Sequence, residues 1–362
     1  MVIFMSIYIH IPFCSTICTY CDFCKMYYNK KYIDSYLNSL KTEIEERYKG
    51  EKVKTIFIGG GTPTTLDTEE LTKLLEITKL FDIEDKIEFT IESNIESITE
   101  DKLRILKKYG INRLSIGVQS FSEEIIKILG RVHTKEEIYK KVELVKKYFD
   151  NINIDLIYAV NDNINIVKED ISNFLKLDVS HMSAYSLIIE DKTILKINNH
   201  QNINEDIDYE MYKYIEKTLE KNNYIHYEVS NYAKKGFESK HNLVYWNNEE
   251  YYGFGLGSTS YINNIRRVNT KNLTKYLNNN YLEEENYEDK RERIENEIML
   301  GLRKLEGLNL DTFKEKYSVS FEEIYDIKNL LEQNYLIKEE NKLKINKEYI
   351  YTSNEILLKI LS

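Results

Sequence analysis

The sequence is poor in proline, tryptophan and cysteine, and it lacks long apolar runs. Its 362 residues include two prolines, one tryptophan and four cysteines. No stretch of about 18 consecutive apolar residues occurs, which excludes an integral membrane protein with a spanning helix. Lys and Arg number 50 against 60 Asp and Glu, which gives a net charge of -10. This balance excludes a broad phosphate-binding face, so we expect no nucleic acid partner.

The two prolines stand beside the residues that carry chemistry. Pro12 lies two positions before the first cysteine, and Pro63 closes the run Gly59-Gly60-Gly61-Thr62-Pro63. Proline fixes φ and removes a backbone donor, so both positions predict shaped turns.

All four cysteines fall between positions 14 and 24, as Cys14, Cys18, Cys21 and Cys24. Thiolates this close on one loop can converge on a soft metal centre, either an iron-sulfur cluster or zinc. Structural zinc sites usually pair two separate Cys-x2-Cys units, and the chain has no second pair, so the cluster is favoured. No apolar signal segment precedes Tyr8, which predicts a reducing, cytoplasmic location and free thiols. Cys24 is open to three interpretations: an inert neighbour, a redox-sensitive thiol or a fourth ligand.

Strand and helix patterns alternate along the first half of the chain. We expect strands at 6–11, 54–58, 87–91, 113–118, 152–158 and 181–187. Helical patterns follow at 31–48, after Asp67 with a capping box to Glu70, and at 100–109, 135–148 and 166–175. Six such βα units predict a parallel sheet with helices outside and functional residues at the carboxyl ends of the strands.

Polar and glycine residues stand at those carboxyl ends. The three glycines after the second strand would let backbone amides approach the charged end of a ligand, although a plain tight turn is the alternative. Glu92 and Gln119 end the third and fourth strands, Arg131 follows, and Asp155 lies in the fifth. Taken singly, each of these residues could also be an ordinary solvent-exposed side chain with no role in binding.

The cysteine spacing, the glycine turn and these strand-end residues, taken in order along the chain, resemble the radical SAM superfamily. The resemblance is to the branch that contains oxygen-independent coproporphyrinogen oxidases and heme chaperones. The resemblance implies an α/β fold, an open three-quarter βα barrel. It implies that Cys14, Cys18 and Cys21 hold a 4Fe-4S cluster whose fourth iron binds S-adenosyl-L-methionine. The residues implied to contact S-adenosylmethionine are Tyr8, Gly60, Gly61, Thr62, Glu92, Gln119, Arg131 and Asp155.

A later motif, His241-Asn242-Leu243-Val244-Tyr245-Trp246, contains the only tryptophan. It is similar to the His-Asn-x-x-Tyr-Trp motif of the HemW heme chaperone family. The imidazole of His241 could ligate heme iron, and the alternative is a hydrogen-bonded core histidine. The resemblance implies a chaperone that binds heme and transfers it to apoproteins such as membrane respiratory enzymes. The alternative is a coproporphyrinogen III oxidase that performs radical SAM oxidative decarboxylation, and the question of a homodimer stays open.

Three units are expected: the barrel core at 1–200, an extension with the His-Asn-x-x-Tyr-Trp motif at 201–282, and a C-terminal domain at 283–362. The last follows a charged stretch at 283–296 and shows the pattern helix 310–317, helix 321–331, hairpin 336–345 and helix 354–361. This order resembles a winged-helix α+β domain. Its acidic pairs, Glu322-Glu323 and Glu339-Glu340, offer no basic face for DNA.

Overall fold

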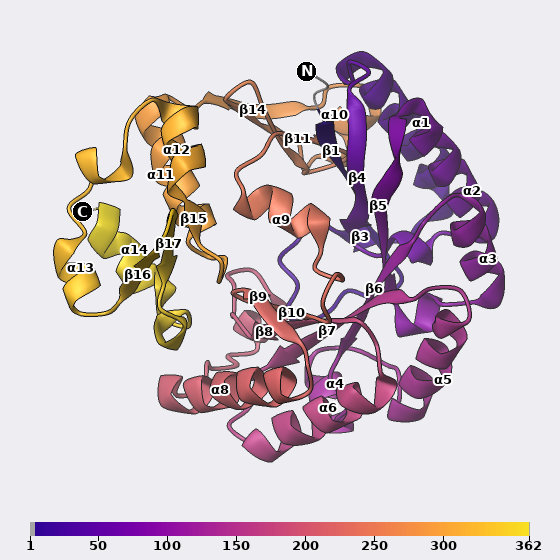
Figure 1. Cartoon of the computed structure of the whole chain (residues 1–362). Coiled ribbons are helices and arrows are strands. Elements are labelled where there is room, and N and C mark those ends of the chain that lie inside the picture. Colours follow the sequence, from indigo (N-terminus) through magenta and orange to yellow (C-terminus); the bar gives the residue numbers. More distant parts are fainter. Residues whose placement is uncertain (1–3, 362) are drawn as a thin grey trace.

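We describe residues 4–361 of the chain from a computed structural model (Figure 1). Six parallel strands form the middle of one large sheet, in the order β1-β4-β5-β6-β7-β8. They are β1 (Phe4–Ile11), β4 (Lys52–Gly60), β5 (Asp82–Asn94), β6 (Arg113–Gln119), β7 (Asn151–Tyr158) and β8 (His181–Ser186). All six predicted strands are therefore confirmed.

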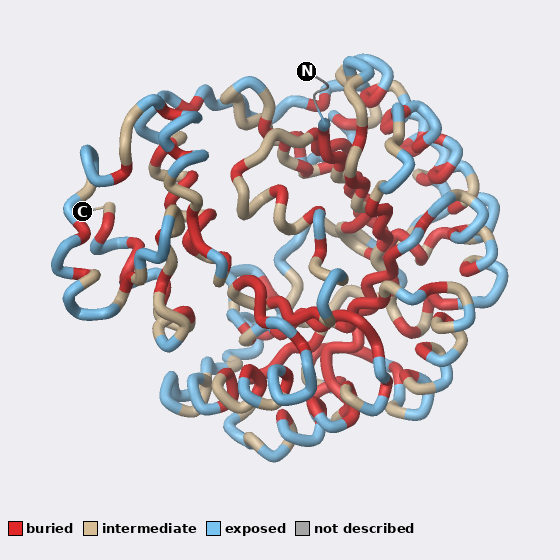
Figure 2. Tube along the Cα trace, in the orientation of Figure 1, coloured by how far each residue is buried: buried red, intermediate tan, exposed pale blue. Residues whose placement is uncertain are grey.

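Helices cover the convex face of this sheet (Figure 1). They are α1 (Lys30–Arg47), α2 (Thr68–Ile77), α3 (Glu100–Lys108), α4 (Glu123–Ile128), α5 (Lys135–Lys146), α6 (Ile164–Leu177) and α8 (Glu205–Lys221). Shorter helical turns are η1 (Pro63–Thr65), η2 (Thr78–Leu80), η3 (Ile95–Ser97) and α7 (Ile194–Ile197). The predicted capping box of α2 is present between Asp67 and Glu70. Figure 2 shows buried strands inside and exposed helix surfaces outside.

Short strands that the sequence patterns did not indicate extend the sheet at both edges. Beyond β8 lie β10 (Asn231–Ala233) and β9 (Ile225–Glu228), both antiparallel. Beyond β1 lies the parallel β11 (Tyr251–Phe254), followed by antiparallel β12 (Thr259–Ile262), β13 (Ile265–Asn269) and β14 (Leu282–Tyr287). The sheet ends at β9 and β14 and does not close. The expected open, partial barrel is confirmed.

The two faces of the sheet differ in chemistry because side chains alternate along each strand. The face under the helices is apolar and fully buried, as Ile9, Ile58 and Ile116 show. Removing such side chains from water drives the sheet and helices together, at about 25 cal/mol per Å². The concave face is polar, and α9 (Lys240–Trp246) lies across it (Figure 1). The backbone amides of Lys240 and His241 donate to the Glu88 carboxylate of β5, at 3.0 and 2.9 Å.

The chain after β14 has its own apolar core, drawn from residues between Ile294 and Ile360. Its elements are α11 (Lys290–Gly301), β15 (Leu308–Asn309), α12 (Leu310–Tyr317), η4 (Phe321–Glu323), α13 (Lys328–Glu332), β16 (Leu336–Glu339), β17 (Lys342–Ile345), η5 (Lys347–Tyr349) and α14 (Ser353–Leu361). A small helix, α10 (Leu273–Leu277), precedes β14. The winged-helix-like order of helices and hairpin is present. Within residues 4–361, no helix is long and apolar enough to cross a membrane.

One expectation for this region needs correction. The helix expected at 321–331 is broken into η4 and α13, because the Asp326 carboxylate accepts the amide of Lys328 at 3.1 Å and starts a new turn. The charged stretch at 283–296 forms most of β14 and the first half of α11. The boundary expected at residue 283 falls inside β14, and the division into three units stays a proposal.

Candidate functional site

The cysteines lie on the loop between β1 and α1, which is clamped at its base by a small parallel ladder. Strands β2 (Phe13–Cys14) and β3 (Met26–Tyr27) pair there. The Met26 amide donates to the Pro12 carbonyl, and the Tyr28 amide to the Cys14 carbonyl, both at 2.8 Å. All four cysteines are free thiols. The loop therefore presents unpaired sulfurs from a fixed base.

Three of the four cysteines line one cavity of about 490 Å³ at the carboxyl ends of the strands. The cavity brings together Cys14, Cys18 and Cys21 with seven of the eight residues predicted to contact S-adenosylmethionine. Those seven are Gly60, Gly61, Thr62, Glu92, Gln119, Arg131 and Asp155.

Cys24 and Tyr8 line a second cavity, of about 380 Å³, which shares Asp22, Phe23, Gly60 and Glu92 with the first. The side chain of Cys24 packs against Gly257, where an added Cβ would come within 2.9 Å of the Cys24 Cβ. Tyr8 donates to Nδ1 of His10 at 3.0 Å, and Nε2 of His10 donates to the Cys24 carbonyl at 2.7 Å. Burial lowers the pKa of His10 to about 4, so this imidazole is neutral. The structure thus separates Cys24 from the other three sulfurs.

The glycine turn after β4 is packed so closely that side chains would not fit. A Cβ on Gly60, whose φ is +117°, would lie 2.7 Å from the His10 ring. A Cβ on Gly61 would lie 2.9 Å from the sulfur of Cys14. The Gly60 amide donates to Oε2 of Glu92 at 3.0 Å. The turn therefore lets backbone reach both the sulfur and the carboxylate.

Four carboxyl groups line the first cavity, and two of them, Glu92 and Asp155, are on strands of the sheet. Burial, together with the charge of Asp155, raises the pKa of Glu92 to about 8. Burial also raises the pKa of Asp155, against hydrogen bonds from Asn153 at 2.7 Å and Ser115 at 3.3 Å. Such shifted carboxyls in a cavity are typical of ligand sites.

Arg131 and Gln119 stand on the far wall of the cavity. The guanidinium of Arg131 donates to the sulfur of Cys18 at 3.5 Å, to Glu96 at 3.2 Å and to the Gly117 carbonyl at 3.2 Å. Its Nε has no hydrogen-bond partner among the described residues. Gln119 has a φ of +70° where the pairing of β6 with β7 shifts by one residue. A non-glycine residue in this conformation marks strain that often accompanies a binding site.

His241 occupies a buried position on α9. Its Nδ1 is hydrogen-bonded to Oγ1 of Thr55 at 2.8 Å and its Nε2 to the hydroxyl of Tyr245 at 2.9 Å. The residue is 1% exposed, and burial lowers the pKa of its imidazole to about 3. This geometry is that of a core histidine, and a heme iron would have to displace one of the two hydrogen bonds.

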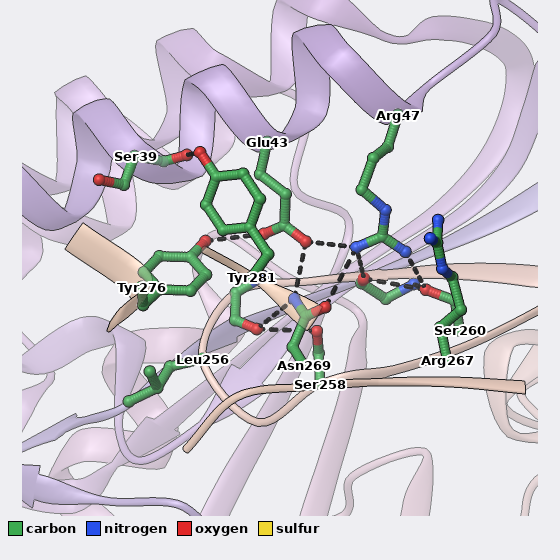
Figure 3. Close-up of polar contacts among 12 residues, drawn as sticks. Ser39, Glu43, Arg47, Leu256, Ser258, Ser260, Arg267, Asn269, Tyr276 and Tyr281 are labelled. Atoms are coloured by element: carbon green, nitrogen blue, oxygen red, sulfur yellow. Dashed lines mark hydrogen bonds and ion pairs between the residues drawn. The ribbon is translucent and has the colours of Figure 1, made fainter. Parts of the chain in front are cut away.

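A buried polar network fixes the chain that packs on Cys24 (Figure 3). Glu43 of α1 accepts the Gly255 amide at 2.9 Å, Nδ2 of Asn269 at 2.7 Å and the Tyr276 hydroxyl at 2.7 Å. It also forms an ion pair with Arg47, whose Nη2 donates to Ser260 at 2.7 Å. The network ties α1 to the segment 253–260 and holds Gly257 against the cysteine loop.

The donor set suits a cluster better than one ion. Within residues 4–361, no three His, Cys, Asp or Glu side chains gather as ligands of a single metal ion. Cysteine thiolates are the ligands of iron-sulfur clusters, and three cysteines line this cavity. Burial raises the pKa of the Cys14 thiol to about 12, so iron would have to displace its proton on binding.

Sequence patterns missed several residues of the site, including Arg113, Asn94 and Asn153, which line the first cavity. These residues could have been predicted from strand alternation, because every second residue of β5, β6 and β7 points to the concave face. The polar series from Arg113 through Ser115 to Gln119 would have revealed this face.

The chain is similar to known proteins over nearly its whole length. Residues 8–171 match the Radical SAM superfamily, and residues 289–348 match the HemN C-terminal domain. The heme chaperone HemW of Lactococcus lactis is 40% identical over 98% of this chain and 97% of its own length. The heme chaperone HemW of Bacillus subtilis is 37% identical over 97% of each chain.

Among solved structures, the coproporphyrinogen III oxidase HemN of Escherichia coli, described as a radical SAM enzyme, has a TM-score of 0.85. The match covers 98% of this chain and 89% of that one at 20% identity. At this identity, the likeness establishes the fold alone.

Proposed function

Because the chain belongs to the HemW family of heme chaperones, we propose that it binds heme and hands it to apoproteins, with a 4Fe-4S cluster and S-adenosylmethionine as cofactors. The observation that carries the proposal is the 40% identity to a HemW protein over nearly the whole of both chains. The free thiols suit a reducing compartment, so we place this activity in the cytoplasm.

Cys14, Cys18 and Cys21 would hold the cluster, since their side chains line one cavity. Cys24 is proposed as a neighbour and not a ligand, because it lines the second cavity and packs on Gly257. The cluster would supply an open iron to the cofactor and an electron for redox chemistry.

The first cavity has the charges that S-adenosylmethionine needs. The two carboxyls that come from its strands, Glu92 and Asp155, suit the ammonium and hydroxyl groups of the ligand, and the guanidinium of Arg131 suits its carboxylate. Gly60, Gly61 and Thr62 offer a close backbone approach, and Gln119 would contact the ligand from the end of β6. Tyr8 would act through His10, to which it is hydrogen-bonded.

Heme is the cargo in this proposal, and apoproteins such as respiratory enzymes are the acceptors. His241 stays a proposed iron ligand, although the proposal does not depend on it, since both of its ring nitrogens have partners. The C-terminal unit, which contacts the end of α9, is proposed to support this region and not to bind DNA.

The test is anaerobic reconstitution of the full chain, followed by two separate assays. Heme titration should give a saturable Soret change at about one heme per chain, and the loaded protein should pass heme to an apoprotein. Incubation with coproporphyrinogen III, S-adenosylmethionine and a reductant should give no decarboxylated product. Product at a catalytic rate, or no saturable heme binding, would overturn the chaperone proposal.

A further inference from the structure

Arg113 is the largest fully buried side chain among the described residues, and its Nε is unpartnered. It is 2% exposed, it begins β6, and it lines the first cavity. Its Nε has no hydrogen-bond partner within residues 4–361, and none of their carboxylates forms an ion pair with it. A guanidinium keeps its charge in a protein, and an uncompensated buried charge is costly. A negative charge in or beside the cavity must therefore balance the positive charge of Arg113.

Strand register places two carboxyls on the same polar face as Arg113, further along the neighbouring strands. Arg113 is opposite Thr90 of β5, so Glu92 lies one inward position further along that strand. On β7, Asp155 is opposite Gly117 and so lies two inward positions beyond the level of Arg113. Burial raises the pKa of both carboxyls, and the charge of Arg113 opposes that effect. Glu92 and Asp155 are thus cavity carboxyls on which this charge acts.

Three other titratable groups around Arg113 are uncharged and so cannot balance its positive charge. His181 of β8 and His241 of α9 are neutral, since burial first and Arg113 second lower the pKa of each. Tyr227 of β9 stays protonated, because burial raises its pKa well above the usual value.

Two further charged groups lie near this face. Glu88 of β5, one inward position before Thr90, accepts two amides of α9 and adds a negative charge on the side of Arg113 away from Glu92. Lys54 of β4 pairs with Glu249.

We propose that Arg113 is a positioning residue for S-adenosylmethionine: its buried guanidinium is the counter-charge that keeps Glu92 and Asp155 as carboxylates when the cationic ligand binds. The inference rests on the cofactor part of the proposed function. Arg113 would act through the two acids and need not touch the ligand.

The consequence is a change in how binding depends on pH. An ammonium or sulfonium group favours ionised carboxyls, so affinity rises as pH rises through the pKa of Glu92. Without Arg113 the carboxylates lose an attractive charge, and the midpoint of that rise moves to higher pH by about one unit or more. At pH 7.5 affinity should therefore fall about tenfold, and it should recover as the solution is made more alkaline.

The experiment measures S-adenosylmethionine binding to the cluster-reconstituted full chain by anaerobic calorimetry between pH 6.5 and 9.5. It compares wild type, Arg113→Met and Arg113→Lys. The ligand's own titration is common to all three, so differences between profiles report the protein. The Lys variant keeps the charge and should retain the wild-type midpoint. If the Met variant does not fold, Arg113→Gln takes its place with the same expectation.

The outcomes separate this inference from the proposed function. Weaker binding that is restored at alkaline pH in the neutral variant supports the role of Arg113. An affinity loss of equal size at every pH, or an unchanged profile, overturns it. If wild type itself fails to bind S-adenosylmethionine at any pH, the cofactor part of the proposed function fails first.

Discussion

At the scale of single residues, side chains that are close in sequence are divided between two cavities. Cys14, Cys18 and Cys21 line the first cavity, whereas Cys24 lines the second, although only two residues separate it from Cys21. Spacing alone could not assign Cys24, because the direction of a side chain on an irregular loop depends on its packing. Here Gly257 supplies that packing from far along the chain.

This division predicts the iron content of four variants. Cys14→Ser, Cys18→Ser and Cys21→Ser should each lose the cluster, because each removes one of three thiolates. Cys24→Ser should keep most of it, and it is the matched control. The measurement is iron and sulfide per chain, with the visible spectrum, after anaerobic reconstitution. Equal loss of iron in all four variants would contradict the three-ligand site.

His241 provides a second residue-scale prediction. His241→Ala should lower the free energy of unfolding at pH 7 by about 2–4 kcal/mol, because it leaves a cavity and removes the partners of Thr55 and Tyr245. As the proposed iron ligand, His241 should also be needed for the wild-type Soret band, so the heme spectrum should shift. Chemical denaturation and a heme titration check this, and an unaltered Soret band would show that the imidazole is structural.

The same variant has a predicted pH dependence. The pKa of His241 is about 3 in the folded chain, below the value of about 6.5 expected for the unfolded chain. Between these values the unfolded chain binds the proton, so the contribution of His241 is present at pH 7 and is lost as pH falls. The stability gap between wild type and His241→Ala should narrow by about 2 kcal/mol from pH 7 to pH 5. A gap that stays constant in denaturation at both pH values would contradict the neutral, buried imidazole.

At the scale of elements, the strongly patterned βα units were predictable and the edge strands were not. The six central strands are apolar and β-branched on their buried face, which is the signal that sequence patterns carry. Strand β14 reads Leu-Glu-Glu-Glu-Asn-Tyr and is exposed throughout, so its residues resemble a solvated linker. Pairing with β13 creates it, and no local pattern records that pairing. Likewise, the network of Glu43 joins α1 to residues more than 200 positions away.

That network predicts a large local effect. Glu43→Ala should cost about 3–5 kcal/mol of unfolding free energy, because it leaves Arg47 without its buried partner. Glu45→Ala on the same helix is the matched control, since its pair with Lys41 is exposed and should cost less than about 1 kcal/mol. Denaturant titration of both variants checks the difference, and equal losses would contradict the role of Glu43.

At the scale of the whole molecule, one buried carboxylate joins the C-terminal unit to the end of α9. Glu297 of α11 accepts from Nδ2 of Asn248 at 3.3 Å and from the Tyr317 hydroxyl at 3.0 Å. Lys316 of α12 completes the contact with an ion pair to Glu297 and a hydrogen bond to the Asn248 carbonyl. The position of α9 over the concave face therefore depends on residues of the last unit.

Removing the Glu297 contact should make α9 more mobile while the sheet stays intact. Glu297→Ala should lower the unfolding free energy by about 1–3 kcal/mol, since Lys316 is partly exposed. Amide hydrogen exchange in residues 240–247 should speed up more than exchange in β4 and β5. Glu295→Ala, on the same helix and paired only with Arg291, is the control. Unchanged amide exchange in α9 would show that the Glu297 contact does not stabilise this helix.

The order of strands also has a consequence for synthesis of the chain. The cysteine loop leaves the ribosome early, but β11 pairs with β1, and Gly257 packs on Cys24. Gly257 lies 233 positions after Cys24, as their numbers show. At roughly 5–20 residues per second, the Cys24 thiol of the nascent chain stays without this cover for about 10–50 s. During translation the cysteine loop is therefore accessible from the side on which β11 and Gly257 later pack.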